Sequence, residues 1–351
     1  MSDAKKFRVG LTRDLMNRNG EPSFGREVLA LLDRDDVEWE WIPEAPPEIT
    51  PDIAARYDGI HLGGPRLTRA SIARDDFRLK IVARHGVGYD SVDVGACAER
   101  GIVVTNAPLG VRRPVAVMAM TFILALSQRL MFKQQLAREH RWGERQENLG
   151  DGLVGRTLGI IGAGSIGRET MRMAQPFNLD VLINDPYVDP AELQFAGGEI
   201  VGLDDLLARS DYVVIACLLN DDTRHLINAR ALSLMKPTAY LINVARGPIV
   251  DEKALIDALR AKTIAGAALE VFEQEPPAQD NPLLTMEFGD SVIVTPHSLC
   301  WTDQCFAGLG GSAIQSIMDV AARKAPRYVV DRRALDHSRM SAWLRGPNSP
   351  G

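Results

Sequence analysis

Two side chains suited to binding anions and moving protons stand at the ends of predicted strands. Arg246 follows the apolar run 240–244, and His297 follows the run 292–294. A guanidinium orients a carboxylate and polarises a carbonyl, and an imidazole exchanges a proton near neutral pH. Glu275 is a candidate partner that would accept a hydrogen bond from the imidazole and fix its tautomer. Taken singly, each residue is better explained as one that caps or solvates a loop, so other parts of the sequence must decide.

A glycine-rich loop at 162–167 predicts a dinucleotide site. It reads Gly-Ala-Gly-Ser-Ile-Gly, follows the apolar run 158–161 directly and opens a helical stretch. Gly162 permits a tight turn, Gly164 lets the backbone approach a pyrophosphate, and Gly167 lets the helix pack close to the strand. We expect the phosphates at the helix N-terminus.

Asp185 ends the next predicted strand. An acidic side chain there accepts hydrogen bonds from the adenosine ribose hydroxyls and repels a 2′-phosphate, which favours NAD over NADP. The alternative is that Asp185 only caps a turn before Pro186. Hydride transfer from a nicotinamide to C2 of a 2-oxo acid needs a cation that orients the carboxylate and an acid near pH 7, and Arg246 and His297 are the candidates for these two roles.

Short apolar runs alternate with helix-period segments, which indicates parallel sheets flanked by helices. One series precedes a long helix expected near 114–139, and a second series follows it. The runs are 8–11, 37–42, 59–62, 80–83 and 102–105, then 158–161, 181–183, 212–215, 240–242 and 292–294. The sequence therefore predicts an α/β protein with two doubly wound parallel-sheet domains.

The last helical segment, near 303–323, is too short for a third domain, so we expect it to return to the first sheet. The predicted substrate domain is 1–106 plus 299–330, and the predicted NAD-binding domain, inserted at 107–298, includes the long helix. Two chain crossings predict a hinge. The segment 331–351 is rich in Arg, Ser, Pro and Gly and predicts a flexible tail, although Trp343 has the side chain to dock.

Composition narrows the class of protein. The 351 residues exceed the usual size of one core, and 46% hydrophobic with 25% charged residues is ordinary globular usage. The net charge of −6 argues against nucleic acid as a partner. The start lacks an apolar leader and the stretch 115–126 is shorter than a membrane span, so we expect a cytoplasmic protein with no membrane partner. Cysteine spacing predicts buried thiols and no metal site at Cys97, Cys217, Cys300 and Cys305.

Three segments resemble the signature segments of the D-isomer-specific 2-hydroxyacid dehydrogenases, the family of phosphoglycerate dehydrogenase and glyoxylate/hydroxypyruvate reductase. They are Asn-Val-Ala-Arg-Gly-Pro-Ile-Val-Asp at 243–251, Val-Phe-Glu-Gln-Glu-Pro-Pro at 271–277 and Thr-Pro-His at 295–297. Their order and spacing match too. Together with the glycine loop and His-Gly-Val-Gly-Tyr-Asp at 85–90, the resemblance covers roughly residues 55–320.

The resemblance implies a flavodoxin-like substrate domain with an inserted Rossmann NAD-binding domain, and a homodimer built on the inserted domain and the long helix. It implies that Arg246 binds the substrate and that Glu275 and His297 form an acid/base pair. The backbone amides of Val87 and Gly88 would receive the substrate carboxylate. The implied cofactor contacts come from Gly162, Gly164, Ser165, Ile166, Gly167, Asp185, Thr223, Val244, Ala245 and Glu270.

The sequence departs from the family pattern in several places. Glu270 stands where the family commonly has an Asp facing the nicotinamide, and residues 112–118 lack the usual Val-Ala-Glu. Trp301 replaces small residues and is predicted to bind substrate as a pocket wall; the alternative is packing between the domains. Arg84 either serves a second acidic group on the substrate or pairs with a surface carboxylate.

Two other functions fit the same motifs. A phosphite dehydrogenase would carry the same catalytic set, whereas formate enzymes usually have Gln at the position of Glu275. An NAD-sensing, corepressor-like binding protein would also keep the fold, but the chain has no long low-complexity arm and no basic localisation run. Turnover with a 2-oxo acid favours the enzyme, and NAD binding with a nucleotide-dependent protein partner favours the sensor.

Overall fold

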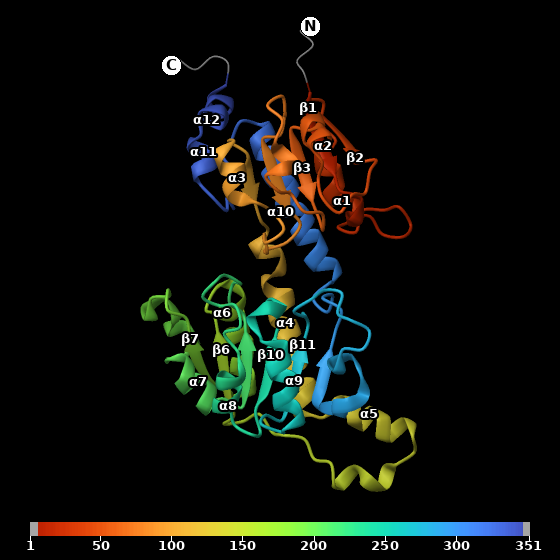
Figure 1. Cartoon of the computed structure of the whole chain (residues 1–351), viewed down its shortest axis with the longest axis vertical. Helices are drawn as coiled ribbons and strands as arrows, with labels where there is room; N and C mark the ends of the chain where they lie inside the picture. Colours follow the sequence, from red (N-terminus) through yellow and green to blue (C-terminus); the bar gives the residue numbers. More distant parts are fainter. Residues whose placement is uncertain (1–5, 347–351) are drawn as a thin grey trace. The chain divides into compact units, whose positions relative to one another are not determined.

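The computed structural model describes residues 6–346, which form two compact units (Figure 1). The first unit combines the segment that ends at Val111 with the segment that begins at Trp301, and the second unit is Arg112–Cys300. The chain therefore leaves the first unit once and returns to it once. The sequence predicts these crossings at 106/107 and 298/299.

The first unit contains a five-stranded parallel sheet in the order β2-β1-β3-β4-β5. Its strands are β1 Phe7–Leu11, β2 Val37–Trp41, β3 Gly59–Leu62, β4 Ile81–Arg84 and β5 Val103–Thr105. Val9 of β1 pairs with Gly59, and Ile60 of β3 pairs with Val82. The order reverses between β1 and β3, as in doubly wound flavodoxin-like sheets.

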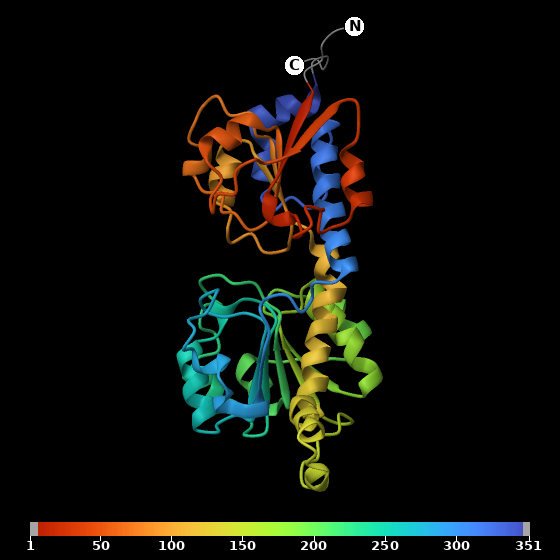
Figure 2. The same cartoon turned by 90° about the vertical axis from the view of Figure 1, so that its right-hand side faces the viewer.

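Helices cover both faces of this sheet (Figure 2). Residues of α10 (Asp303–Ala321) pack with Val9, Ile81 and Ala83 on one face, beside α1 (Arg26–Leu29). The opposite face, with Ile60 and Val82, packs against α2 (Pro51–Arg56) and α3 (Val94–Glu99). The sheet is buried on both sides, which explains why its strands read as continuous apolar runs.

The second unit contains a seven-stranded parallel sheet in the order β12-β11-β10-β9-β6-β7-β8. Its strands are β6 Thr157–Ile161, β7 Asp180–Asn184, β8 Glu199–Ile200, β9 Tyr212–Ile215, β10 Tyr240–Asn243, β11 Gly266–Leu269 and β12 Val292–Val294. The helices α7 Leu203–Arg209, α8 Ala229–Leu234 and α9 Glu252–Arg260 pack on one face. On the other face, Gly167 of α6 (Ser165–Ala174) lies close to Ile160. The prediction of two doubly wound parallel sheets is confirmed.

The long helix expected near 114–139 is two helices. The first, α4, spans Pro108–Ser127 and contains Pro114, and α5 spans Leu130–Arg138. They are separated by Arg129, whose φ of 51° lies in the left-handed region and ends the α-helical path. By length and composition α4 could cross a membrane, but half of its most apolar window is buried in the protein, as in the core helix of a globular domain.

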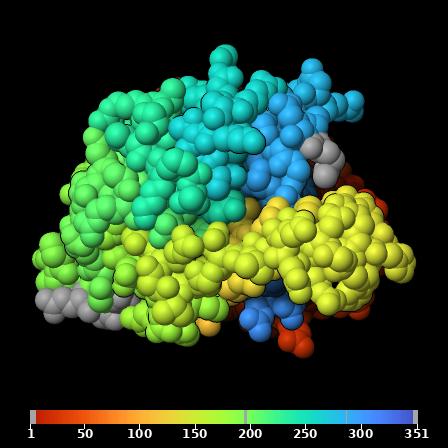
Figure 3. Space-filling view, turned by 90° about the horizontal axis from the view of Figure 1, so that it is seen from below, coloured from red at the N-terminus to blue at the C-terminus, as the bar shows by residue number. Residues whose placement is uncertain are grey.

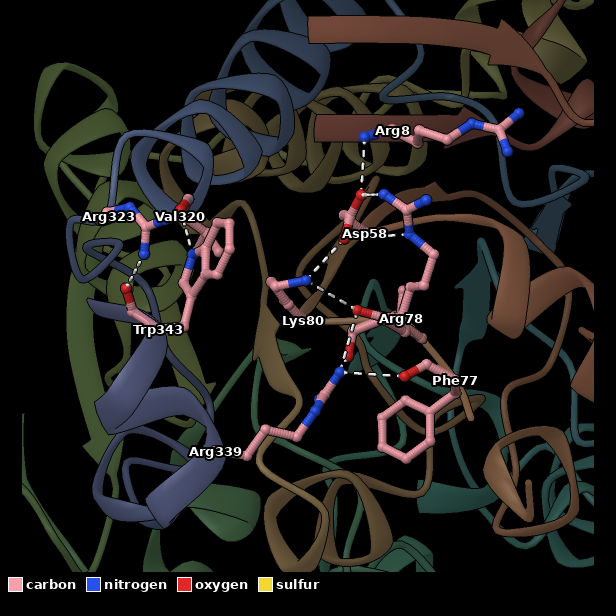
Figure 4. Close-up of polar contacts among 10 residues, drawn as sticks. Arg8, Asp58, Phe77, Arg78, Lys80, Val320, Arg323, Arg339 and Trp343 are labelled. Carbon is pink, nitrogen blue, oxygen red and sulfur yellow. Dashed lines mark hydrogen bonds and ion pairs between the residues drawn. The ribbon is translucent and has the colours of Figure 1, made fainter. Parts of the chain in front are cut away.

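The prediction of a flexible tail over 331–351 is wrong for its described part, because residues up to 346 form α11 (Arg333–Asp336) and α12 (Ser338–Arg345). Arg339 of α12 donates to the carbonyls of Phe77, Arg78 and Leu79, at 2.8–3.3 Å. Figure 4 shows Arg339 beside Phe77 and Arg78. The indole Nε1 of Trp343 donates to the Val320 carbonyl at 2.8 Å. Residues 347–351 lie outside the described part. These partners are distant in sequence, so local composition does not reveal them.

Candidate active site

The register of the second sheet brings the ends of five strands to one edge. Neighbouring strands are paired through Ile161, Ile215, Asn243, Leu269 and Val294. Because the strands are parallel, the residues that follow this row all leave the sheet at its carboxyl edge, where open α/β sheets bind ligands. The glycine loop, Arg246, Glu270 and His297 are among those residues.

The glycine loop has the shape that a pyrophosphate needs. Gly162 has φ 98°, and a Cβ there would lie 2.6 Å from the backbone nitrogen of Cys217. A Cβ on Gly167 would collide with the Gly162 carbonyl, so α6 packs close to the loop. At Gly164 nothing lies within 4 Å of an added Cβ, which leaves a clear approach to the N-terminus of α6 at Ser165 and Ile166. The loop therefore fits the phosphates of a dinucleotide.

Asp185 connects this loop to the end of β7. Its Oδ2 accepts a hydrogen bond from the Ala163 amide at 2.8 Å, and its Oδ1 accepts one from the Tyr187 amide at 2.9 Å. The second bond is the turn cap named above as the alternative. A carboxylate has about four acceptor positions, so the ribose contact stays a prediction beside the cap.

Three of the other predicted cofactor residues lie at the same edge. The Thr223 hydroxyl donates to the Leu218 carbonyl at 2.6 Å and accepts from the Asn220 amide at 2.8 Å, so it stabilises a turn. Val244 is buried, and Ala245 follows it in the loop after β10. Their contacts with a cofactor remain predictions.

Asn243 is a site residue that the sequence reading did not single out. It is 1% exposed; its Oδ1 accepts from the Ala245 amide at 3.0 Å and its Nδ2 donates to the Arg246 carbonyl at 2.9 Å. These bonds fix the turn that carries the Arg246 guanidinium. A Cβ on Gly247 would collide with the Phe272 carbonyl, so this turn lies directly against the segment that leads to Glu275.

Glu275 and His297 form a hydrogen-bonded pair. Glu275 Oε2 lies 2.7 Å from His297 Nδ1, and Glu275 Oε1 accepts from the Phe272 amide at 3.1 Å. The two side chains are 37% and 44% exposed. Burial alone would raise the pKa of Glu275, but the hydrogen bond and charge of His297 outweigh it and lower that pKa. The carboxylate is therefore ionised at neutral pH and orients the imidazole through Nδ1.

Glu270 lies at the end of β11 and is 1% exposed. One oxygen accepts from the Thr295 hydroxyl, and Oε1 accepts from the Leu299 amide at 2.9 Å. Burial raises its pKa, although the bonds from Thr295 and Leu299 oppose that rise. The structure thus brings Glu270 to the turn that contains His297, and its contact with a nicotinamide remains a prediction.

The predicted carboxylate loop lies in the first unit, after β4. The Val87 carbonyl accepts from Asn106 Nδ2 at 2.9 Å, and the Gly88 carbonyl accepts from Arg84 Nε at 3.2 Å. Arg84 also donates to the carbonyls of Leu62 and Gly63. Arg84 and Asn106 therefore hold the loop from two sides, a role that sequence reading did not assign to either.

Trp301 lies at the start of the second segment of the first unit and is 60% exposed. Its ring meets Phe306 edge to face at 5.3 Å, and Phe306 lies 5.2 Å from the His85 ring. His85 Nδ1 lies 3.1 Å from Nε2 of the buried His61. Burial lowers the pKa of His85 to about 3, so it stays neutral near the carboxylate loop. A substrate contact of Trp301 remains a prediction.

Among residues 6–346 whose side chains the structure describes, no group of three or more His, Cys, Asp or Glu is placed to hold a metal ion. Two of the four cysteines, Cys97 and Cys305, are buried. Burial raises the pKa of Cys97 to about 12, so that thiol is protonated at neutral pH.

Comparison with known proteins agrees with this geometry. Residues 120–298 match the family described as D-isomer specific 2-hydroxyacid dehydrogenase, NAD binding domain. A D-3-phosphoglycerate dehydrogenase of Methanocaldococcus jannaschii is 36% identical over 76% of this chain and 50% of its own length. A glyoxylate reductase of Thermococcus onnurineus is 37% identical over 74% of this chain and 78% of its own length. The chain spans about half the length of several curated relatives that it matches.

Solved structures match over almost the whole chain. The crystal structure of a glyoxylate reductase from Paecilomyes thermophila superposes with a TM-score of 0.80 at 26% identity, covering 94% of this chain and 99% of that one. The family match over the second unit and the structural match over both units identify the second unit as an NAD-binding Rossmann domain. The chain belongs to the D-isomer specific 2-hydroxyacid dehydrogenase family.

Proposed function

We propose that this protein is an NAD-dependent dehydrogenase that interconverts a small D-2-hydroxy acid and the corresponding 2-oxo acid. The observation that carries the proposal is the Glu275–His297 pair, at 2.7 Å, on the same sheet edge as Arg246 and the glycine loop. Relatives named glyoxylate reductase and D-3-phosphoglycerate dehydrogenase support the substrate class.

Bound at the glycine loop, NADH supplies the hydride that reduces C2 of the substrate. Arg246 binds the substrate carboxylate and polarises the C2 carbonyl, since a guanidinium offers paired donors to planar oxygen groups. The Glu275 carboxylate holds Nδ1 of His297, so Nε2 is the nitrogen that delivers the proton to the forming alkoxide. In the oxidative direction the same nitrogen removes the hydroxyl proton. We include the Val87 and Gly88 amides as carboxylate donors and Trp301 as a wall of the pocket.

The test is the oxidation of NADH, followed by absorbance, with glyoxylate, hydroxypyruvate, pyruvate, 2-oxoglutarate, phenylpyruvate and branched 2-oxo acids. His297→Ala should lower turnover by ~10²–10⁴-fold, because it removes the proton donor. Arg246→Ala should lower it by loss of substrate orientation. NADH binding, measured by fluorescence titration, should survive in both variants.

A matched control exists in the same unit. His225 Nε2 lies 2.7 Å from Glu273 Oε1, in a pair whose side chains are exposed to much the same degree as those of Glu275 and His297. His225→Ala should leave turnover near wild type. Equal losses in both His variants, or turnover without His297, would refute the mechanism. Tight NADH binding without turnover on any 2-oxo acid would move weight to phosphite or to nucleotide sensing.

We also propose a homodimer in the cytoplasm. Large apolar side chains are exposed along α4, α5 and the segment that follows. Within the second unit they are Val117, Leu130, Met131, Trp142, Leu149 and Val154. Figure 3 shows the part of the chain around α5, in yellow, on the surface. Exposed apolar side chains favour an interface, and a second copy of the chain is the proposed occupant. The cysteine spacing, which indicates no disulfide framework, supports a reducing compartment.

A further inference from the structure

Glu270 makes hydrogen bonds to alternate residues of one short segment. Its side chain accepts from the Thr295 hydroxyl and from the Leu299 amide, and its backbone carbonyl accepts from the His297 amide at 3.0 Å. Its own amide donates to the Asn243 carbonyl at 3.1 Å. One buried residue at the end of β11 therefore connects the turn of Arg246 with the whole segment 295–299.

This segment needs such support. It follows the last residue of β12. The Thr295 amide still donates to the Leu269 carbonyl and the His297 amide to the Glu270 carbonyl, both at 3.0 Å, so these backbone bonds extend as far as His297. His297 has φ 53°, in the left-handed region that residues with a Cβ rarely adopt. A side chain carried on this backbone points correctly only if its neighbours on both sides are fixed. The two oxygens of Glu270 fix the residues two positions before and two positions after His297.

We propose that Glu270 is a positioning residue for His297: its carboxylate holds the segment 295–299 so that the imidazole meets Glu275. The proposal rests on the proposed function of His297. It stands beside the cofactor contact predicted above, because the bonds from Thr295 and Leu299 use only some of the four or so acceptor positions of the carboxylate. The two carboxylates beside His297 thus have separate tasks, Glu275 on the ring and Glu270 on the backbone.

The pKa directions agree with that division. Burial raises the pKa of Glu270, whereas the bond from His297 lowers the pKa of Glu275 against the effect of burial. A carboxyl group with a raised pKa keeps its proton up to a higher pH. Its oxygens can accept hydrogen bonds from Leu299 and Thr295 whether the group is protonated or ionised.

The test compares Glu270→Ala, Glu270→Gln and Thr295→Val. Glu270→Ala removes both side-chain bonds and should lower kcat by about 10–100-fold, because small misplacements of a catalytic group have costs of that size. The loss should appear in kcat, with the substrate KM within about threefold of wild type, and any change in NADH affinity reports the separate cofactor contact. Glu270→Gln keeps the shape and can still accept from Leu299, so it should recover most of the activity. Thr295→Val removes one bond from the opposite side and should lower kcat by an intermediate factor.

A double variant separates this role from others. In the His297→Ala background, Glu270→Ala should cause no further loss of turnover, because its effect acts through His297. The proposal would be overturned if Glu270→Ala lowered turnover by the same factor in the His297→Ala background as in the wild-type protein. It would also be overturned if Glu270→Ala weakened NADH binding and left kcat unchanged. If His297→Ala itself retains wild-type turnover, the proposed function fails instead, so the two failures are distinguishable.

Asp211→Asn is the matched control. Asp211 is a buried carboxylate in the same unit that accepts from the Thr157 amide at 2.8 Å, at the amino edge of the sheet. Its loss should lower the melting temperature and leave kcat near wild type. Circular dichroism melts show which variants fold, and Glu270→Gln and Thr295→Val keep the proposal testable if Glu270→Ala does not.

Discussion

Replacing Trp343 by Ala should destabilise the first unit, although Trp343 lies in the segment expected to be flexible. Its Nε1 donates to the Val320 carbonyl, and its own carbonyl accepts from Arg323 at 2.7 Å. The cations of Lys80 and Arg323 lie 4.4 and 4.1 Å from the centre of its ring, and Phe7 packs at 6.0 Å. The substitution removes all the contacts of the ring and leaves the bond to the Trp343 backbone.

The expected cost follows from those contacts. The hydrogen bond from Nε1 contributes about 1 kcal/mol. Each cation over the ring contributes about 0.5–1 kcal/mol at a partly exposed site. Partial burial of the ring contributes about 1.5 kcal/mol, at the low end for a large apolar side chain. Together they give about 3.5–4.5 kcal/mol, which corresponds to a drop of roughly 7–18 °C in the melting temperature of a unit of this size.

Scanning calorimetry measures this loss and separates the transitions of the two units where they do not coincide. The lower transition of Trp343→Ala should move while the other stays in place. Trp301→Ala is the control, because Trp301 is 60% exposed and should shift neither transition by more than about 2 °C. A Trp343→Ala protein that melts like wild type would show that α12 does not stabilise the first unit.

Two further substitutions test the buried charge of the first unit and the nucleotide loop of the second. Burial raises the pKa of Asp58, but the bonds from Arg78, the Arg8 amide and Lys80 outweigh it, so its folded pKa lies below the ordinary 3.8. The ionised Asp58 carboxylate therefore contributes its full stabilisation at pH values above 3.8. This contribution is lost as the pH falls through the lower pKa of the folded state. Asp58→Asn should unfold at lower urea than wild type at pH 7, and the gap should close as acid protonates the wild-type carboxyl; a gap independent of pH would contradict this. Gly164→Val should melt like wild type, because an added Cβ meets nothing within 4 Å, yet bind NADH at least about tenfold more weakly by fluorescence titration; unchanged affinity would place the phosphates elsewhere.

Most strands could be predicted because both sheets are buried on two faces and their strands read as apolar runs. Two strands gave no such pattern. The strand β11 is Gly-Ala-Ala-Leu, which lacks β-branched residues, and β8 is a two-residue edge strand with both side chains exposed. The break at Arg129 was also hidden, because residues on both sides of it have good helix propensity.

The residues of the active site were also only partly predictable from the sequence. Arg246, Glu275 and His297 were found from strand ends and motif spacing, and the structure brings Glu275 and His297 within hydrogen-bonding distance. Asn243 and Asn106 were missed because their tasks are hydrogen bonds to backbone groups of neighbouring turns. A sequence pattern shows which residue types are present, but the direction of a buried amide side chain depends on the packed turn around it.

The division of the first unit between two distant segments affects its order of formation during synthesis. The second unit is one continuous segment, Arg112–Cys300, so its sheet can form as soon as that segment leaves the ribosome. The first unit must wait for α10, which fills one face of its sheet, and for α12, whose contacts reach residues 260 positions earlier. Until those helices emerge, the apolar face made by Val9, Ile81 and Ala83 lacks the part of its cover that α10 supplies. In a nascent chain of this protein, the second unit is therefore folded while the first unit is still incomplete. Chaperones should bind the amino-terminal segment of that chain.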